Sequence, residues 1–273
     1  MILSARKKKT VKKFLSIIPD LAQNCNWENI EFFSRLCDNG NIEEANGMAL
    51  QRLTERIWYY PFEEERDRPN LGYIRGDKWS LAVDAGHSDG HVEEFYKALE
   101  KENLPLPALT VLTHWHWDHT CGLHWISGLS IASAATNRYL RSFRDRIARE
   151  GREAFLSIHE SVRLEYAGGR EIRIEPADME FEGSLLLDAG NCPIRIFRAE
   201  APHTDDSTFV YMPGEKVLFL GDAPCGAFPD WKKNPVLTGK LAETIRSVDP
   251  EICLEGHWTP ESLENTLNDL ENG

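Results

Sequence analysis

Short apolar runs recur along the chain from about residue 53, and most of them have the length of a β-strand. In the first half of the chain, the predicted strands cover residues 56–60, 72–74, 79–83, 109–112 and 129–132. In the second half, they cover residues 171–174, 184–187, 194–197, 208–212, 217–220 and 251–254. The strands therefore fall into two similar halves separated by a long polar stretch, and this pattern predicts a mixed α and β fold.

Apolar residues recur at helical spacing between these strands. The first such segment places Val92, Phe95 and Leu99 on one face and is followed by a Pro-rich turn. The long polar stretch in mid-chain has the same periodicity and predicts one or two helices that cover part of the domain. The predicted helices cover residues 90–103, 135–166, 238–248 and 261–270.

Residues 1–50 differ from the rest of the chain. Residues 6–13 carry six positive charges and no negative one, and residues 27–37 predict one short amphipathic helix. We expect an N-terminal extension that packs on the body or extends into solvent; docking of residues 6–13 on an acidic partner or a membrane surface is the less favoured alternative. The apolar run at 14–18 is shorter than a signal-peptide core, so we expect neither export nor a membrane span.

Composition and charge narrow the classes of function. The 273 residues are 41% hydrophobic, which is ordinary for a globular protein, and the formal net charge is −13. Because six positive charges lie in the basic run, the remainder of the chain is strongly acidic and would repel nucleic acid. Six cysteines without a closely spaced pair indicate a reducing cytoplasm. We therefore expect a cytoplasmic protein that acts on a small molecule.

The chemistry concentrates after the predicted strand at 109–112. His114, His116, Asp118 and His119 follow within eight residues of its end. Alternate side chains of an extended segment share a side, so His114 and His116 can bind one cation. As the chain turns, Asp118 and His119 can face a neighbouring cation. Two metals need more ligands than these four.

Three further candidate ligands lie at the ends of later strands: His203, Asp222 and His257. With Asp84 after an early strand, the motifs stand in the order Asp, HxHxDH, lone His, Gly-Asp and Gly-His. With this order of motifs, the chain resembles the metallo-β-lactamase superfamily from about residue 55 to its end. The resemblance implies an α+β fold, a four-layer αββα sandwich over residues 51–273, with residues 1–50 as an N-terminal extension.

The resemblance also implies a role for each candidate. His114, His116 and His203 would hold one metal, Asp118, His119 and His257 a second, and Asp222 would bridge them, while Asp84 would support the metal loop. Nitrogen and oxygen ligands suit two zinc ions, and iron or manganese remain open. A hydroxide held between the two cations would attack the substrate. Asp118 would orient this nucleophile and pass a proton to the leaving group.

Several branches of the superfamily lack support in the sequence. The common antibiotic-cleaving β-lactamases differ at the Asp222 and His119 positions, glyoxalase II carries a longer C-terminal region, and nucleases carry insertions that this chain lacks. We expect a binuclear hydrolase that cleaves an ester, thioester or lactone in a small, anionic substrate. The alternative is an iron-dependent sulfur dioxygenase with one iron on His114, His203 and Asp222. A non-catalytic binding module that uses the basic N-terminus is a third possibility.

Other polar and aromatic residues receive plainer predictions. His87 and His91 are expected to be ordinary histidines of a loop and a helix start, because the seven-ligand set is complete without them. Trp115 and Trp117 would pack in the core or line the cleft. The arginines of the long polar stretch predict a solvated face rather than an anion clamp: Arg138, Arg141 and Arg144.

Overall fold

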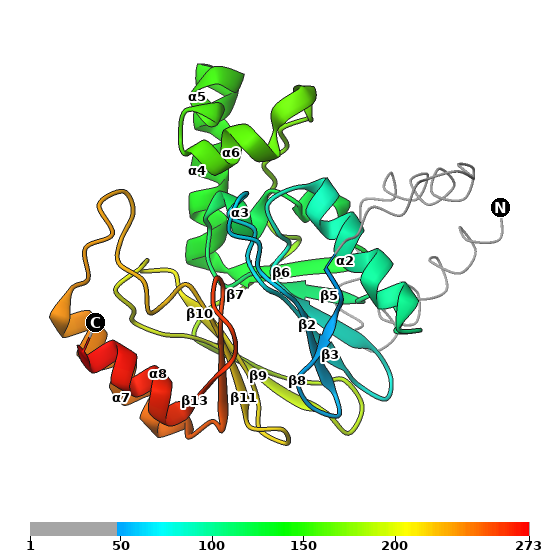
Figure 1. Ribbon diagram of the computed structural model, residues 1–273, viewed down its shortest axis with the longest axis vertical. Coiled ribbons are helices and arrows are strands. Elements are labelled where there is room, and N and C mark those ends of the chain that lie inside the picture. The colour runs from blue at the N-terminus through cyan, green and yellow to red at the C-terminus, as the bar shows by residue number, and fades with distance from the viewer. Residues whose placement is uncertain (1–47, 273) are drawn as a thin grey trace. The chain divides into compact units, whose positions relative to one another are not determined.

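Two β-sheets lie face to face in the computed structural model, which describes residues 48–272 (Figure 1). The first sheet is antiparallel from β1 to β4 and parallel from β4 to β7. In spatial order it consists of β1 (Gln51–Arg52), β2 (Ile57–Tyr60), β3 (Leu71–Arg75), β4 (Ser80–Val83), β5 (Leu109–Val111), β6 (Leu129–Ser133) and β7 (Met179–Phe181).

The second sheet is antiparallel except where β11 runs parallel to β12. In spatial order it consists of β13 (Glu261–Ser262), β12 (Ile252–Glu255), β11 (Val217–Gly221), β10 (Thr208–Met212), β9 (Pro193–Arg198) and β8 (Ser184–Asp188). Its central strands are buried on both faces, which is why β11 reads as a continuous apolar run. The edge strand β8 alternates between exposed and half-buried residues.

Helices cover the outer face of each sheet. On the side of the first sheet lie α2 (Asp89–Lys101) and α4 (Ala134–Glu150), with α3 (Trp117–Thr120) at the sheet edge. From α4 the short helices α5 (Arg152–Leu156) and α6 (Glu160–Glu165) extend beyond the edge of the sheets (Figure 1). The 3-10 turns are η4 (Leu123–Trp125) and η5 (Ala167–Gly169). The second sheet carries α7 (Pro235–Val248) and α8 (Leu263–Asn272). The order of layers is helix, sheet, sheet, helix, so the predicted αββα sandwich is confirmed.

The largest hydrophobic cluster fills the space between the sheets. Val83 and Val111 of the first sheet and Val210 and Phe219 of the second all belong to it and are at most 3% exposed. Burying one such side chain stabilises the fold by about 1.5–3 kcal/mol. Smaller clusters join α2 and α4 to the first sheet and α7 and α8 to the second. Each layer is therefore held by its own apolar contacts.

The predicted strand at 171–174 is wrong. Ile172 and Ile174 pack into the cluster beneath the helices, and the chain reaches the sheet only at β7, where Met179 pairs with Ile131. The stretch 135–166 forms three helices rather than one or two. A short alternating run predicts a strand equally well whether its apolar face meets a helix layer or a sheet, so sequence alone does not separate the two.

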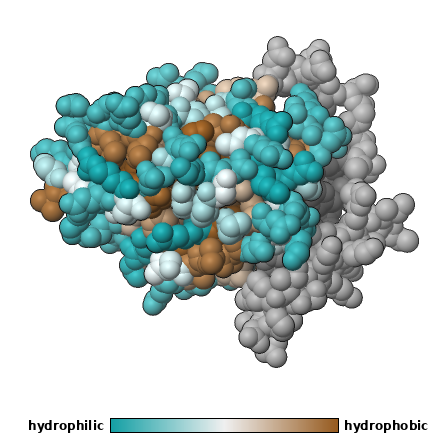
Figure 2. Space-filling model, turned by 90° about the horizontal axis from the view of Figure 1, so that it is seen from below, coloured by the Kyte–Doolittle hydropathy of each residue, from teal (hydrophilic) through white to brown (hydrophobic). Residues whose placement is uncertain are grey.

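Helix boundaries shift where caps decide them. The helix α7 begins three residues before the predicted start, because the Asn234 side chain accepts hydrogen bonds from the backbone N–H of Val236 and Leu237. The basic run 6–13 and the helix predicted at 27–37 lie outside the described residues, and a domain boundary at residue 50 stays a prediction. Among the residues described, no helix is long and apolar enough to cross a bilayer. The face in Figure 2 shows separate hydrophobic patches among hydrophilic side chains.

Three strand ends meet at one edge of the sandwich. The strand β5 of the first sheet leads into His114, while β11 and β12 of the second sheet lead into Asp222 and His257. The connection between β9 and β10 adds His203 at the same edge. The fold thus gathers residues that are far apart in sequence.

Candidate metal centre

The structure brings all seven predicted ligands together in two groups. His114, His116 and His203 form one group. Within each group the possible ligand atoms lie within 4.8 Å of one another. The second group consists of Asp118, His119, Asp222 and His257.

In the first group three imidazole rings surround one point. His203 Nε2 lies 2.9 Å from His116 Nδ1, and the His114 ring centre is 4.8 Å from that of His116 and 4.9 Å from that of His203. His114 and His116 share a side because they are two residues apart in the extended segment before α3. Three nitrogens at this spacing can bind one transition-metal ion and leave a position open for water or substrate.

The second group mixes imidazole and carboxylate. His119 Nε2 lies 3.2 Å from both Asp118 Oδ2 and Asp222 Oδ1, and His257 Nε2 lies 3.0 Å from Asp118 Oδ2. Asp222 Oδ2 lies 3.5 Å from His257 Nε2 and 3.7 Å from His203 Nε2. Asp222 therefore stands between the two groups, which is the position that a bridging ligand requires.

Neighbouring groups fix the orientation of the imidazoles. His119 Nδ1 lies 2.7 Å from Asp84 Oδ2, and the Asp84 carboxylate also accepts hydrogen bonds from the backbone N–H and hydroxyl of Thr113. His203 Nδ1 donates to the carbonyl of Gly226 at 2.8 Å. A proton on Nδ1 leaves the Nε2 lone pair free to face the centre. Asp84 stands where the resemblance placed a supporting residue and is not in either ligand group.

Protonation differs between the two groups. Burial, reinforced by neighbouring imidazoles, lowers the pKa of His114 well below its usual value and that of His116 to about 3. These rings are neutral at neutral pH. Burial opposes protonation of His257 as well, but the carboxylates of Asp222 and Asp118 outweigh it and raise its pKa to about 9. The second group thus carries negative charge that attracts protons when no cation is present.

Three buried polar atoms of the centre lack a hydrogen-bond partner, as expected of metal ligands. His114 Nε2, His119 Nε2 and Asp222 Oδ1 are buried and make no hydrogen bond, although the last two lie 3.2 Å apart. A buried polar atom without a partner costs about 1–3 kcal/mol, so three at one place indicate missing ligands. Imidazole nitrogen and carboxylate oxygen suit zinc, iron or manganese. The donor set fits two divalent cations, and the identity of the metal stays a prediction.

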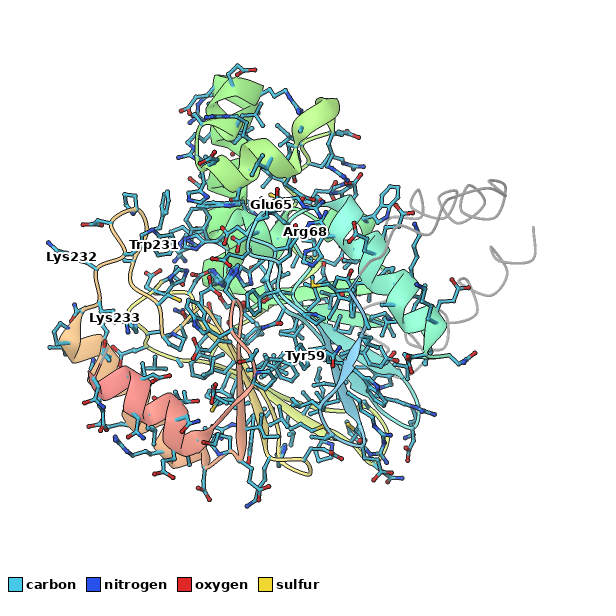
Figure 3. All side chains as sticks on the ribbon, viewed as in Figure 1. Tyr59, Glu65, Arg68, Trp231, Lys232 and Lys233 are labelled. Atoms are coloured by element: carbon cyan, nitrogen blue, oxygen red, sulfur yellow. The ribbon has the colours of Figure 1, made fainter. Side chains whose placement is uncertain are left out.

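Aromatic rings border the centre. Trp231 is 49% exposed and stacks on His203, with ring centres 6.0 Å apart and planes 17° from parallel. Phe228 lies edge-on to Trp117, which is buried, and Trp115 is half-buried beside His116. Figure 3 shows Trp231 on the loop that precedes α7. Trp115 and Trp117 both pack in the hydrophobic cluster beside the centre, which is the first of the two predicted roles.

A cavity of about 560 Å³ adjoins the centre at His203. About half of its lining residues are small or apolar, and three are charged: Arg198, Glu200 and Asp205. The apolar members are Ala199, Ala201, Pro202, Ala227 and Leu237. A substrate group with apolar character can enter here beside the first ligand group.

Sequence reasoning missed two contacts of the loop between β2 and β3. Asp67 Oδ1 lies 3.5 Å from His257 Nδ1, and Arg68 is buried in an ion pair with Glu165. The acidic run that precedes these residues is typical of a solvated loop, so the sequence held no signal for either contact. His87 and His91 occupy a loop and the start of α2 as expected, but both are fully buried.

The arginines of the polar stretch lie outside the centre. Arg138 is exposed and lies over the Tyr139 ring, Arg141 pairs with Glu180, and Arg144 pairs with Asp145. None of the three belongs to a ligand group. Their positions agree with the predicted solvated face.

The chain is similar in sequence to a known family and to curated proteins. The family model for the metallo-beta-lactamase superfamily matches residues 66–251. The acyl-coenzyme A thioesterase MBLAC2 of Gallus gallus is 26% identical over 183 residues, which cover 62% of this chain and 63% of the relative. The chain thus spans less than two thirds of that relative. The Homo sapiens protein of the same name is 22% identical over 218 residues, covering 72% and 75%.

Solved structures show the same fold at lower identity. The DIM-1 metallo-beta-lactamase exposed to ceftazidime superposes with a TM-score of 0.62 at 18% identity, covering 84% of this chain and 97% of that one. A metallo-beta-lactamase from Pontibacter korlensis gives a TM-score of 0.58 at 16% identity, covering 83% and 100%. At these identities the likeness carries the fold alone.

Proposed function

Because this chain belongs to the metallo-β-lactamase superfamily, we propose that it is a metal-dependent hydrolase that cleaves the thioester of an acyl-coenzyme A or a similar small anionic substrate. The observation that carries the proposal is the pair of adjacent ligand groups with Asp222 between them. When bound, two divalent cations would supply an activated water and polarise the acyl oxygen. The residues of the chain hold, orient and exchange protons.

Asp118 is the proposed catalytic residue. Its Oδ2 faces His257 and His119 in the second ligand group, and its side chain is almost fully buried. Burial and two imidazoles fix the carboxylate in one orientation, and the imidazoles hold its pKa well below the usual value, although burial acts in the opposite direction. An ionised, fixed carboxylate can accept a proton from the attacking water and return it to the leaving group.

A thioester suits this arrangement better than an amide or ether. A thiol leaving group has a pKa near 8.5, so it departs as an anion near neutral pH with little help from a general acid. The relatives named acyl-coenzyme A thioesterase support this class of substrate. The apolar wall of the cavity beside His203 would receive the acyl group.

The loop before α7 supports an anionic substrate. Lys232 and Lys233 follow Trp231 there, and both lysines are exposed (Figure 3). The phosphates of a coenzyme A group would find cations at this rim of an otherwise acidic protein. A cytoplasmic location and a lack of nucleic-acid partners stay predictions.

The test begins with metal content. We expect two zinc ions per chain and release of thiol from acyl-coenzyme A without oxygen uptake, with loss of turnover after chelation and recovery on addition of zinc. Asp118→Asn should lower kcat by about 10²–10⁴-fold, since it removes the proton acceptor. Esters, lactones and phosphodiesters serve as comparison substrates. A single iron with oxygen uptake on glutathione persulfide would instead establish the dioxygenase and overturn the proposal.

A further inference from the structure

The loop between β2 and β3 reaches the second ligand group through one carboxylate. Asp67 Oδ1 lies 3.5 Å from His257 Nδ1, on the opposite side of the ring from Asp118 and Asp222. We propose that Asp67 is a positioning residue for His257, which it orients for binding the second cation. This inference rests on the proposed two-metal centre.

The other histidines whose Nε2 faces the centre set the pattern. His119 Nδ1 lies 2.7 Å from the Asp84 carboxylate, and His203 Nδ1 donates to the Gly226 carbonyl. His114 Nδ1 lies 3.1 Å from the Thr113 hydroxyl, which itself donates to Asp84. Metal-binding histidines commonly donate their outer N–H to such an oxygen, which fixes the tautomer and raises the basicity of the ligand. Asp67 brings the corresponding oxygen to 3.5 Å from His257 Nδ1, as an ion pair rather than a hydrogen bond.

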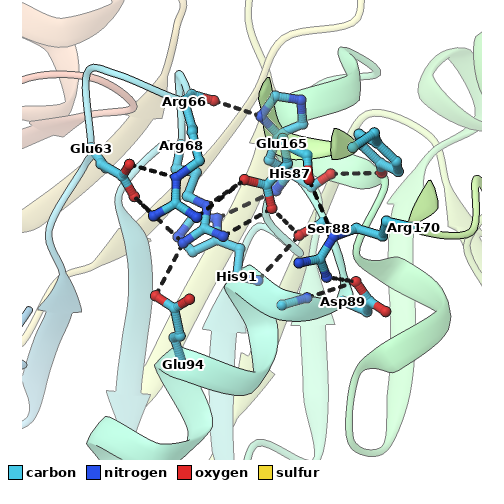
Figure 4. A network of polar contacts seen from close by, with 12 residues as sticks. Glu63, Arg66, Arg68, His87, Ser88, Asp89, His91, Glu94, Glu165 and Arg170 are labelled. Atoms are coloured by element: carbon cyan, nitrogen blue, oxygen red, sulfur yellow. Dashed lines mark hydrogen bonds and ion pairs between the residues drawn. The ribbon is translucent and has the colours of Figure 1, made fainter. Parts of the chain in front are cut away.

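The loop is anchored so that Asp67 stays at this place. Glu63 and Arg68 pair through two backbone hydrogen bonds of 2.8 and 2.9 Å, and the Asp67 backbone turns with φ +52° between them. Arg68 is then held by Glu165 of α6 in a buried ion pair (Figure 4). A non-glycine residue keeps a positive φ only where the surrounding structure holds it there, and the residues on both sides of Asp67 do so.

A second set of bonds ties the loop to the backbone around His257. The Asn70 amide donates to the carbonyls of Glu255 at 2.8 Å and Trp258 at 2.7 Å, and the Asn70 N–H donates to the carbonyl of Gly256. The backbone on both sides of His257 is thus fixed to the same loop that carries Asp67. Asn70 holds the backbone of His257 in place, and Asp67 would orient its imidazole ring.

His257 has more need of such support than its partners. Its side chain is 15% exposed, whereas those of His119 and His203 are fully buried. Packing alone therefore confines the ring less. An outer hydrogen-bond partner typically changes metal affinity by about 10–100-fold. This range is the expected contribution of Asp67 to the second site.

The experiment compares two variants that both tolerate the positive φ. Asp67→Gly removes the carboxylate, whereas Asp67→Asn keeps an oxygen in the same place. Metal-free full-length protein is titrated with zinc against a chromophoric chelator, and cobalt absorption spectra report the ligand geometry. We expect Asp67→Gly to weaken the second zinc by about 10–100-fold with the first unchanged, and Asp67→Asn to weaken it by less. Glu65→Ala, an exposed carboxylate of the same loop (Figure 3), should change neither site.

A double-mutant cycle shows whether Asp67 acts through His257. In a His257→Ala background, Asp67→Gly should cause no further loss of zinc affinity. A further loss of equal size there would overturn the positioning role. So would a wild-type protein that binds two zinc ions no more tightly than Asp67→Gly. A wild-type protein that binds no second metal would instead overturn the proposed function itself.

Discussion

Arg68 and Glu165 form a buried ion pair that joins the β2–β3 loop to α6. Arg68 Nε donates to Glu165 Oε2 at 2.8 Å, and Nη2 donates to Oε1 at 2.9 Å. The two side chains are 1% and 0% exposed, and the Ser88 hydroxyl also donates to Glu165. The pair connects segments 97 residues apart. It ties the loop that carries Asp67 to α6 (Figure 4).

Breaking this pair should destabilise the fold strongly. Arg68→Met removes both hydrogen bonds that Arg68 donates to the buried Glu165 carboxylate and leaves only Arg66, 3.8 Å away, as a counter-charge, so we expect the free energy of unfolding to fall by about 3–5 kcal/mol. Lys97→Met is the matched control, because Lys97 pairs with Glu93 on the exposed surface of α2 and should cost at most about 0.5 kcal/mol. Urea denaturation measures both. Equal small effects would contradict a structural role for the buried pair.

The same pair predicts a dependence of stability on pH. Burial would raise the pKa of Glu165, but the hydrogen bonds and charge of Arg68 outweigh burial and lower it. A carboxyl whose pKa is lowered in the folded state stabilises the protein at any pH above its pKa in the unfolded chain, which is about 4.5. This stabilisation is lost as the pH falls through the pKa of the folded state. As pH falls below about 5, the free energy of unfolding of Glu165→Gln should therefore decrease less than that of the wild type. Chelator-treated protein is used for both, and parallel curves would contradict the prediction.

The local sequence predicts the ligands better than it predicts their supports. His114, His116, Asp118 and His119 lie within six residues, so strand and turn geometry alone groups them. Once the sheets are in place, the strand ends bring the later ligands to the same edge. The fold class and most strands follow from apolar periodicity in the same way.

The supporting contacts depend on positions that local sequence does not determine. Asp67 meets His257 across 190 positions, and Arg68 meets Glu165 across 97. Each contact needs the loop trajectory fixed by Asn70 and by the turn at Asp67. The false strand at 171–174 has a similar cause, since its apolar face meets the helix layer rather than a sheet neighbour. Short-range patterns carry no information on which layer a face will meet.

Trp231 should affect substrate binding more than stability. It is 49% exposed and stacks on His203, so its ring offers an accessible apolar face beside the proposed site. Removing an aromatic contact of this kind costs about 0.5–1.5 kcal/mol, and Trp231→Ala should therefore lower kcat/KM for an acyl-coenzyme A about 2–10-fold, mainly through KM. Val236→Ala, at an exposed position near the start of α7, is the control. Equal kinetics for the two variants would count against Trp231 as a binding wall.

Zinc should stabilise the folded chain. His114 Nε2 and Asp222 Oδ1 are buried and make no hydrogen bond, and bound cations would give both atoms a favourable contact. Ligand at a hundred times its Kd stabilises by about 2.7 kcal/mol, so the melting temperature of chelator-treated protein should rise by several degrees when zinc is added. Magnesium, which prefers oxygen ligands, should produce little change. A melting temperature that is insensitive to zinc would contradict the proposed centre.

Gly256 should be essential to the second ligand group. A Cβ atom at this position would lie 2.1 Å from Asp222 Oδ1 and 2.8 Å from His119 Cε1. Both residues are predicted ligands. Gly256→Ala must therefore displace the Asp222 carboxylate, and we expect it to lose the second zinc of the proposed centre with a destabilisation of about 1–3 kcal/mol. Gly239→Ala is the matched control, because a Cβ there meets nothing within 4 Å. Since Gly239 lies within α7, its replacement should stabilise the protein by up to about 1 kcal/mol and leave zinc content unchanged. Metal analysis after dialysis, with urea denaturation of both variants, gives the result, and a Gly256→Ala protein that retains its full zinc content would show that the ligands adjust to a methyl group.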